Sequence, residues 1–400
     1  MALDVPAIEG GEPVRKDPLP YATQWIEQDD IDAVVDVLKS GWLTGGPKIG
    51  EFEREFAAYT GARNCVVVNS CTSALNMSVK ALGIGPGDEV ITTPMTFVAT
   101  TLAIVHAGAT PVFTDILDST LNMDPMDIES RITPRTKAIM PMHYAGNPAD
   151  LDVILNIAAT RGLKVIEDAA HAAGAVYGGR RIGTHGDLVN FSFHAIKNAT
   201  MAEGGCITTA DGELAEKLRT MRYFGIPQDA YKRASSPTPW KYEVVSLGYK
   251  YNTTDIQCAL GLSQLKKLDS FNERRKKLTE MYYEGFWGMD EIVMPVSTEG
   301  SLPSYHIYVI QLNEDRLTVD RDHILRALRA ENISANVHYT PVYSHPYFAE
   351  TMKLDPAAYP VCERAARTIV TLPLFPKMTD ADLESVVAAV RKIVRHYRKR

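Results

Sequence analysis

Short apolar segments of strand type alternate with helix-length segments through the first half of this chain. The apolar segments are rich in valine and isoleucine and lie at residues 65–68, 89–93, 110–115, 137–142 and 163–167. Strands of a parallel sheet are buried on both faces, so they are continuously apolar rather than alternating. Two amphipathic helices are expected before the first strand, at residues 28–38 and 49–59. The pattern predicts an α/β fold in which helices cover a mostly parallel sheet.

The chain changes in character after about residue 210. Residues 225–242 have no hydrophobic period and are expected to form a loop. Periodicity then returns, with helices expected at 254–268, 272–289, 321–331 and 380–397 and strands at 305–312 and 334–339. This mixture predicts a smaller α+β unit. We therefore expect a large domain of residues 1–265 and a small C-terminal domain of residues 266–400.

Composition argues against several classes of protein. The 400 residues include 42 lysines and arginines against 49 aspartates and glutamates, a formal net charge of −7. A mildly acidic chain without a basic stripe is not expected to bind nucleic acid. No uninterrupted apolar run approaches the ~18 residues that could span a membrane. Five cysteines without a CxxC pair give no zinc or redox motif, so we expect no metal site and a reducing, cytoplasmic location.

Polar residues gather at three points where an expected strand ends. The segment NSCTS at residues 69–73 lies between a strand and a helix, and Asp168 follows the strand at residues 163–167. Lys197 lies just beyond the strand-like residues 188–193. The carboxyl ends of strands form the usual ligand crevice of open α/β sheets. We therefore expect the three clusters to meet at one edge of the sheet.

Each cluster also has a purely structural explanation. Asp168 could cap a helix expected to follow it, because aspartate is a favoured N-cap residue. Lys197 could be an exposed loop lysine, and Ser70 or Thr72 could cap the helix after residue 70. The segment at residues 69–73 matches neither GxGxxG nor GxxxxGK[ST], so dinucleotide and P-loop interpretations lose support.

Together, the three clusters match the chemical needs of pyridoxal phosphate. Free backbone N–H groups at the helix N-terminus near residues 69–73 would bind the phosphate. The Asp168 carboxylate would keep the pyridine nitrogen protonated, and the Lys197 amine would form the Schiff base and move the proton. Phe97, at the start of the next strand–helix unit, would cover the ring. The sequence therefore predicts pyridoxal phosphate as cofactor.

Further motifs extend the pattern along almost the whole chain. They are SGWLTGGP at residues 40–47, NSCTSAL at 69–75, PMTF at 94–97, EDAAH at 167–171, SFHAIK at 192–197, EGG at 203–205 and GYKYNTTDIQ at 248–257. With these motifs in this order, residues 25–376 resemble the DegT/DnrJ/EryC1/StrS family of nucleotide-sugar aminotransferases. The resemblance implies fold type I of the pyridoxal-phosphate enzymes, with a mixed, mostly parallel sheet between helices and a smaller C-terminal α+β domain.

The resemblance implies roles for individual residues. Lys197 would hold the cofactor as an internal aldimine and act as proton-transfer base, Asp168 would pair with the pyridine nitrogen, and Phe97 would stack on the ring. The other implied cofactor contacts are Cys71, Thr72, Ser192 and His171, with Lys250 and Asn252 reaching in from the second subunit of a homodimer. The implied substrate contacts are Trp42, His143, Tyr144, His338 and Tyr339.

The resemblance also implies a ping-pong reaction. L-Glutamate would leave its nitrogen on the cofactor as pyridoxamine phosphate and depart as 2-oxoglutarate, and the 4-keto carbon of a UDP- or dTDP-linked sugar would then accept that nitrogen. The segments KYN at residues 250–252, HAIK at 194–197 and HYAG at 143–146 look most like the branch that aminates UDP-4-keto sugars, of the UDP-4-amino-4-deoxy-L-arabinose type. Many family members differ from this chain at Cys71, His171, Lys250 and Asn252, where they carry glycine, glutamine and an Asn/Arg pair.

Two other functions stay open. A related nucleotide-sugar dehydratase carries histidine in place of the Schiff-base lysine; Lys197 disfavours this function, and His194, three residues earlier, is not that substitution. The other alternative is a non-catalytic regulatory protein on the same scaffold. Such a protein would not require Lys197, Asp168 and the phosphate-binding segment together.

Overall fold

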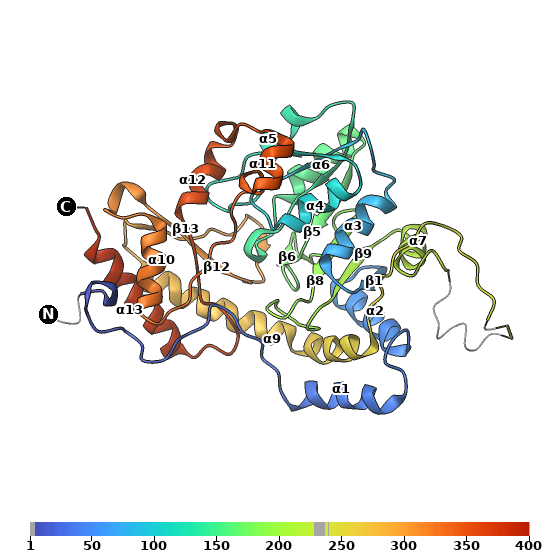
Figure 1. The fold of residues 1–400 in the computed structure, drawn as a ribbon, viewed down its shortest axis with the longest axis horizontal. Coiled ribbons are helices and arrows are strands. Elements are labelled where there is room, and N and C mark those ends of the chain that lie inside the picture. The colour runs from blue at the N-terminus through green and yellow to red at the C-terminus, as the bar shows by residue number, and fades with distance from the viewer. Residues whose placement is uncertain (1–4, 228–236, 239, 400) are drawn as a thin grey trace.

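The computed structural model describes residues 5–227, 237–238 and 240–399, and within them a seven-stranded sheet forms the centre of the fold (Figure 1). Its strands, in the spatial order β1-β9-β8-β5-β4-β2-β3, are β1 (Asn64–Val68), β9 (Gly205–Thr209), β8 (Leu188–Ser192), β5 (Lys164–Asp168), β4 (Thr136–Met140), β2 (Glu89–Thr92) and β3 (Thr110–Phe113). β8, β5, β4, β2 and β3 are parallel, whereas β9 is antiparallel to β8 and β1. The predicted mixed, mostly parallel α/β sheet is confirmed.

Helices cover both faces of this sheet, as continuously apolar strands require. They are α2 (Pro47–Thr60), α3 (Cys71–Ala81), α4 (Val98–His106), α5 (Pro125–Arg131), α6 (Leu151–Arg161) and α7 (Gly212–Arg222). Alternate residues of one strand belong to different cores: Val67 of β1 packs with Phe52 and Phe56 of α2, whereas Val66 packs with residues of α3 and α7. The period of two along the strand therefore builds two hydrophobic layers from one sheet.

One long helix, α9 (Asp255–Phe286), runs beneath the sheet and reaches the C-terminal part of the chain (Figure 1). The sequence predicted a helix at residues 254–268 that continues at 272–289, and the structure joins both stretches in one helix. No glycine or proline interrupts residues 269–271, and Phe271 is buried, so the helical face continues. α9 packs against α1 (Gln28–Ser40), α2 and α13 (Asp380–His396). Residue 265 lies inside this helix, and the division into domains at that residue stays a prediction.

The C-terminal part is built on a small antiparallel sheet of β10 (Ile292–Val293), β12 (Tyr308–Leu312) and β13 (Ile369–Leu372). Its helices are α10 (Arg321–Ala330), α11 (Pro346–Met352), α12 (Pro360–Thr368) and α13. The strand predicted at residues 334–339 does not form. Asn336 makes an isolated bridge to Thr371, and the chain then leaves the sheet, because His338 and Tyr339 line a pocket on the large sheet.

Short elements complete the described chain. A third sheet joins β6 (Val176–Tyr177), β7 (Arg180–Arg181) and β11 (Ser301–Leu302), and 3-10 turns occur at Ala7–Glu9, Tyr144–Gly146, Glu314–Arg316, Val342–Ser344 and Pro356–Ala358. The loop predicted at residues 225–242 lies partly outside the described residues, at 228–236 and 239. Across the described ranges no helix has the length and apolarity to cross a membrane, and no group of three or more potential ligands could hold a metal ion.

Candidate active site

A pocket of about 410 Å³ opens where β5 and β8 end. Its walls come from both parts of the chain. The ends of the large-sheet strands face chain segments that adjoin the strands of the small sheet. Most of the residues predicted from the sequence line it, namely Cys71, Thr72, Phe97, Asp168, His171, Ser192, Lys197, His338 and Tyr339. The three polar clusters therefore meet at one edge of the sheet.

The N-terminus of α3 forms one wall of this pocket. Ser70 is the N-cap, and its Oγ accepts the Ser73 N–H at 3.1 Å, so the structural explanation of Ser70 is correct. The next N–H groups, of Cys71 and Thr72, lie in the first turn of the helix, where no helical carbonyl accepts them. β9 runs so close that a Cβ at Gly205 would lie 2.5 Å from the Cys71 nitrogen. The result is a narrow, backbone-lined anion cradle.

Asp168 ends β5 and is buried at 3% exposure. Its Oδ1 accepts the Ala170 N–H at 3.0 Å, and its Oδ2 accepts the Thr100 hydroxyl at 2.6 Å. The helix expected after Asp168 is absent, because the chain turns there and Gly174 adopts a φ of 85°. Asp168 is therefore not a helix cap. Burial raises the pKa of its carboxyl group, although the Thr100 hydroxyl acts in the opposite direction.

Lys197 follows β8 in a tight turn and lies half-buried in the pocket wall. Its backbone N–H donates to the His194 carbonyl at 2.9 Å. Burial lowers the pKa of the Lys197 amine to about 8, against the opposing influence of Cys71 and Asp168. The interpretation as an exposed loop lysine was wrong. A substantial fraction of this amine is neutral near pH 7.5, and an amine must be neutral to act as a nucleophile or base.

Two residues that the sequence analysis missed contact these groups directly. Thr100, from α4, bonds Asp168, and the Nε2 atom of His306 lies 3.5 Å from the Lys197 Nζ. His306 precedes β12 and reaches the pocket from the other part of the chain. Neither residue lies in a local motif, so only the packing of distant segments could place it here.

Aromatic side chains also line the pocket. The Tyr339 hydroxyl lies 3.0 Å from His171 Nε2, and the Tyr339 ring lies 5.9 Å from that of Phe97, which is 54% exposed. Burial lowers the pKa of His338 to about 4 and that of His171 well below its usual value. Both imidazoles are therefore neutral near pH 7 and can act as hydrogen-bond donors or acceptors.

His143 does not line the pocket, although the sequence analysis expected it near the substrate. It is fully buried, and its Nδ1 accepts the Ala149 N–H at 3.0 Å, so its proton lies on Nε2. Nε2 donates to Glu167, at 2.8 Å, on the face of β5 opposite to Asp168. His143 therefore supports the strand that carries Asp168 and has no surface left for a ligand.

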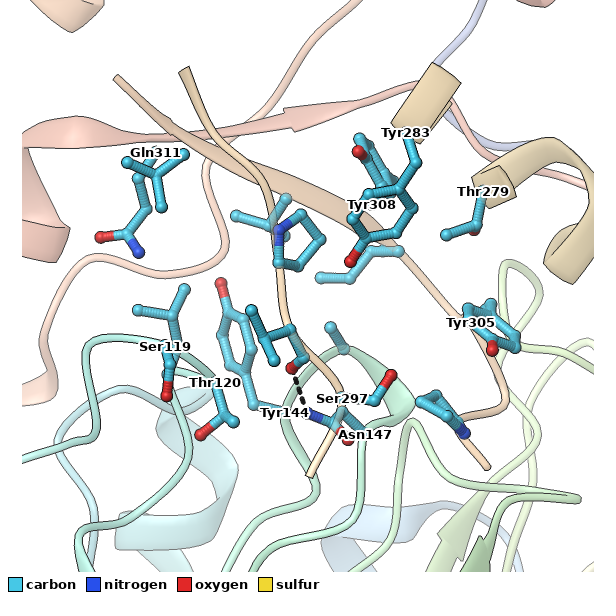
Figure 2. Close-up of a pocket in the computed structure, with 18 residues that line it drawn as sticks. Ser119, Thr120, Tyr144, Asn147, Thr279, Tyr283, Ser297, Tyr305, Tyr308 and Gln311 are labelled. Carbon is cyan, nitrogen blue, oxygen red and sulfur yellow. Dashed lines mark hydrogen bonds between the residues drawn. The ribbon is translucent and has the colours of Figure 1, made fainter. Parts of the chain in front are cut away.

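Tyr144 is also placed differently from the expectation. Its ring lines a separate cavity of about 50 Å³, between the segment around Ser119 and the segment around Ser297 (Figure 2). Its hydroxyl donates to the backbone carbonyl of His338, behind the pocket. Tyr144 therefore supports the His338–Tyr339 segment from behind.

Lys250 and Asn252 lie away from Lys197 in this chain. They line a groove with Thr44 and Arg222, and Lys250 Nζ lies 4.7 Å from the centre of the Tyr223 ring. Trp42 is 37% exposed, next to this groove in sequence. The structure of one chain thus does not bring these three residues into the Lys197 pocket.

Comparison with known proteins gives concordant matches over nearly the whole chain. The DegT/DnrJ/EryC1/StrS aminotransferase family matches residues 24–391. The spore coat polysaccharide biosynthesis protein SpsC of Bacillus subtilis (strain 168) is 46% identical over 378 residues, which cover 94% of this chain and 97% of that protein.

Solved structures of the same kind are similar as well. The putative sugar aminotransferase Spr1654 from Streptococcus pneumoniae, in its PMP form, superposes with a TM-score of 0.88 at 33% identity and covers 95% of this chain and 98% of its own. Helicobacter pylori PseC, an aminotransferase involved in the biosynthesis of pseudoaminic acid, has a TM-score of 0.89 at 30% identity, over 95% and 100% of the two chains. This chain belongs to the DegT/DnrJ/EryC1/StrS aminotransferase family.

Proposed function

We propose that the chain is a pyridoxal-phosphate-dependent sugar aminotransferase that transfers the amino group of L-glutamate to the 4-keto carbon of a UDP- or dTDP-linked sugar. One observation carries the proposal: an anion cradle, a buried carboxylate and a lysine of lowered pKa share one pocket. The description of Spr1654 in a PMP form, and of PseC as an aminotransferase, supports the same chemistry.

The residues present fit this cofactor. The phosphate would lie against the Cys71 and Thr72 N–H groups at the start of α3, which β9 approaches so closely at Gly205 that a Cβ there would collide with the Ser70–Cys71 backbone. Ser192, at the end of β8, would add its hydroxyl. Asp168 would contribute the negative charge that a protonated pyridine nitrogen needs, and such a cation would favour the ionised form of this buried carboxyl.

Bound in this pocket, the cofactor supplies an electron sink that eases removal of a proton from the carbon next to the nitrogen. In this proposal Lys197 takes that proton and returns it, and its pKa of about 8 suits a base working near neutral pH. Phe97 would cover the cofactor ring, with the Tyr339 ring 5.9 Å away, and the buried Nδ1 atom of His171, which has no hydrogen-bond partner among the described residues, would be available to bond the cofactor.

We propose that His338, Tyr339 and Trp42 contact the substrate. His143 and Tyr144 act instead through other residues, because one is fully buried against Glu167 and the other bonds the His338 carbonyl. In the same proposal, the substrate that His338, Tyr339 and Trp42 contact is a UDP-4-keto sugar of the arabinose type.

A homodimer would complete the site. Two apolar residues of α1, Ile31 and Leu38, are 48% and 55% exposed, although their position in an amphipathic helix predicts a packed face. A second copy that covers this side would bring the groove residues Lys250 and Asn252 to the partner's pocket, as the family resemblance implies. A reducing, cytoplasmic location agrees with five cysteines that are all free and buried.

The substrate is tested by incubating purified protein, pyridoxal phosphate and L-glutamate with UDP- and dTDP-linked 4-keto sugars. The proposal predicts an amino sugar and an equal amount of 2-oxoglutarate with at least one of them. A dehydrated sugar, formed by loss of water without use of glutamate, would indicate the dehydratase function. The protein with pyridoxal phosphate is also incubated with L-glutamate alone. If it does not react, a non-catalytic binding protein is favoured.

A further inference from the structure

A line of hydrogen bonds lies behind Lys197 and plays no part in the chemistry described so far. The Lys197 Nζ lies 3.5 Å from His306 Nε2, and the other ring nitrogen of His306 lies 2.8 Å from Asn198 Oδ1. His306 and Asn198 are buried, at 3% and 4% exposure. A buried imidazole with both nitrogens in contact has its proton position fixed by its neighbours.

The neighbours of Asn198 determine that position. Asn272 Nδ2 donates to the Ala173 carbonyl at 3.0 Å, so Asn272 Oδ1 is an acceptor. Asn198 Nδ2 donates to that oxygen at 2.7 Å and to the Ser304 carbonyl at 2.8 Å. Asn198 Oδ1 must then accept, and the donor is the Nδ1–H of His306. The Nε2 atom of His306 therefore presents a lone pair to Lys197.

Burial, with a smaller influence of nearby charges, keeps His306 neutral. Burial lowers the pKa of His306 well below its usual value, and nearby cations act in the same direction. The titratable groups that face the pair are Cys71 and Asp168 at Lys197, and His171, Arg275 and His338 at His306. A neutral imidazole whose proton lies on Nδ1 can accept a hydrogen bond from an amine at Nε2. It cannot donate a hydrogen bond to that amine.

We propose that His306 is a positioning residue for Lys197, a role that rests on the proposed transamination. In that reaction the free Lys197 amine would take a proton from one carbon and return it to another. His306 Nε2 accepts one N–H of that amine and so restricts its rotation, which leaves the amine lone pair free for the substrate. Lys197 gains and loses the proton, and His306 does neither.

Two substitutions of His306 distinguish the loss of its hydrogen-bond acceptor from a change in packing. In His306→Asn, the amide nitrogen replaces Nδ1 and still donates to Asn198, but no acceptor faces Lys197. In His306→Gln, the amide oxygen reaches the place of Nε2 and can accept from Lys197. Thermal unfolding of both variants checks that each is folded.

The first readout needs no cofactor and no turnover. Trace labelling of the cofactor-free full chain with acetic anhydride over a pH series, followed by peptide mass spectrometry, measures the titration midpoint of Lys197. An acceptor stabilises the ammonium form, so its loss lowers the midpoint. We expect His306→Asn to shift the midpoint from about 8 down by about one unit, and His306→Gln to stay within about 0.3 unit of wild type.

The second readout is the rate at which L-glutamate converts the bound cofactor in a single turnover. We expect His306→Asn to be at least about tenfold slower and His306→Gln to lie within about threefold of wild type. Equal midpoints and equal rates for the two variants would overturn the role of His306. If wild-type protein binds pyridoxal phosphate and reacts with glutamate in that case, the proposed function still stands; if wild type does neither, the proposed function itself fails.

Discussion

The Thr100 hydroxyl donates a hydrogen bond of 2.6 Å to the Oδ2 atom of Asp168, and so joins the first turns of α4 to the end of β5. This contact lowers the pKa of a carboxyl group that burial raises. Because the proposed function requires an ionised Asp168 at the pyridine nitrogen, it predicts a dependence on Thr100, which no sequence motif identified.

Thr100→Val should therefore weaken cofactor binding. Loss of the hydrogen bond raises the pKa of Asp168 further, so the affinity for pyridoxal phosphate should fall by about tenfold at pH 7 and more steeply at lower pH. Titration of cofactor-free protein with pyridoxal phosphate at two pH values measures this. Thr101→Val is the matched control, since the neighbouring Thr101 hydroxyl is buried without a hydrogen-bond partner among the described residues; equal losses in the two variants would contradict the account.

Lys197→Met should stabilise the cofactor-free protein at neutral pH. The pKa of Lys197 is about 8 in the folded state against 10.5 in the unfolded chain, so between these values the unfolded state binds more protons and wild-type stability rises with pH. The variant should exceed wild type by about 1–2 kcal/mol at pH 7, after allowance for partial exposure, and the difference should vanish above about pH 10.5. Urea unfolding over this range measures the difference. The exposed-lysine control Lys39→Met should show no such pH dependence, and a constant offset for Lys197→Met would contradict the assigned pKa.

Arg275→Leu should destabilise the fold. Arg275 is 1% exposed in α9, and one of its guanidinium nitrogens donates to the carbonyls of His306, at 2.9 Å, and Leu374, at 2.8 Å. Leucine would leave these buried carbonyls without that donor, at a cost of about 2–4 kcal/mol in the free energy of unfolding. The neighbouring Arg274 bonds the more exposed Asp380, so Arg274→Gln should cost about 1 kcal/mol or less. Urea unfolding of the two variants measures both losses in the free energy of unfolding. Equal losses would show that the hydrogen bonds from Arg275 to these carbonyls do not stabilise the fold.

Mixing two inactive variants tests the shared site of the proposed homodimer. Lys197→Ala and Asn252→Ala should each lose most activity, but a mixed dimer has one site with both wild-type residues if Asn252 serves the partner's pocket. Random reassembly then restores about one quarter of wild-type activity. The control mixture of Lys197→Ala with Asp168→Asn should restore none, because both residues serve the same protomer's site. If the first mixture regained no activity although mixed dimers had formed, Asn252 would lie outside the partner's site.

Much of the large sheet could be predicted because each strand is a local signal. Val66 to Val68 and the similar runs are continuously apolar, and parallel strands need that pattern. Residues 334–339 show the opposite case. They alternate like a strand, but the contacts that Tyr339 makes at the large-sheet pocket outweigh that local preference.

The site divides in the same way. Asp168 and Lys197 both lie at or just beyond the ends of predicted strands, so the topology of the sheet brings them to the same edge. His306 and Thr100 come from segments without a motif, and their roles depend on contacts between distant elements. His143 and Tyr144 lie close in sequence to the pocket, but their side chains point into buried layers that no local pattern indicates.

The central claim is that Lys197 is the residue that binds the cofactor covalently. Wild-type protein incubated with pyridoxal phosphate, reduced with borohydride and digested should yield a single modified peptide with the cofactor on Lys197. Lys197→Ala treated in the same way should yield none. Modification of another lysine in wild type, or equal modification in Lys197→Ala, would contradict the account.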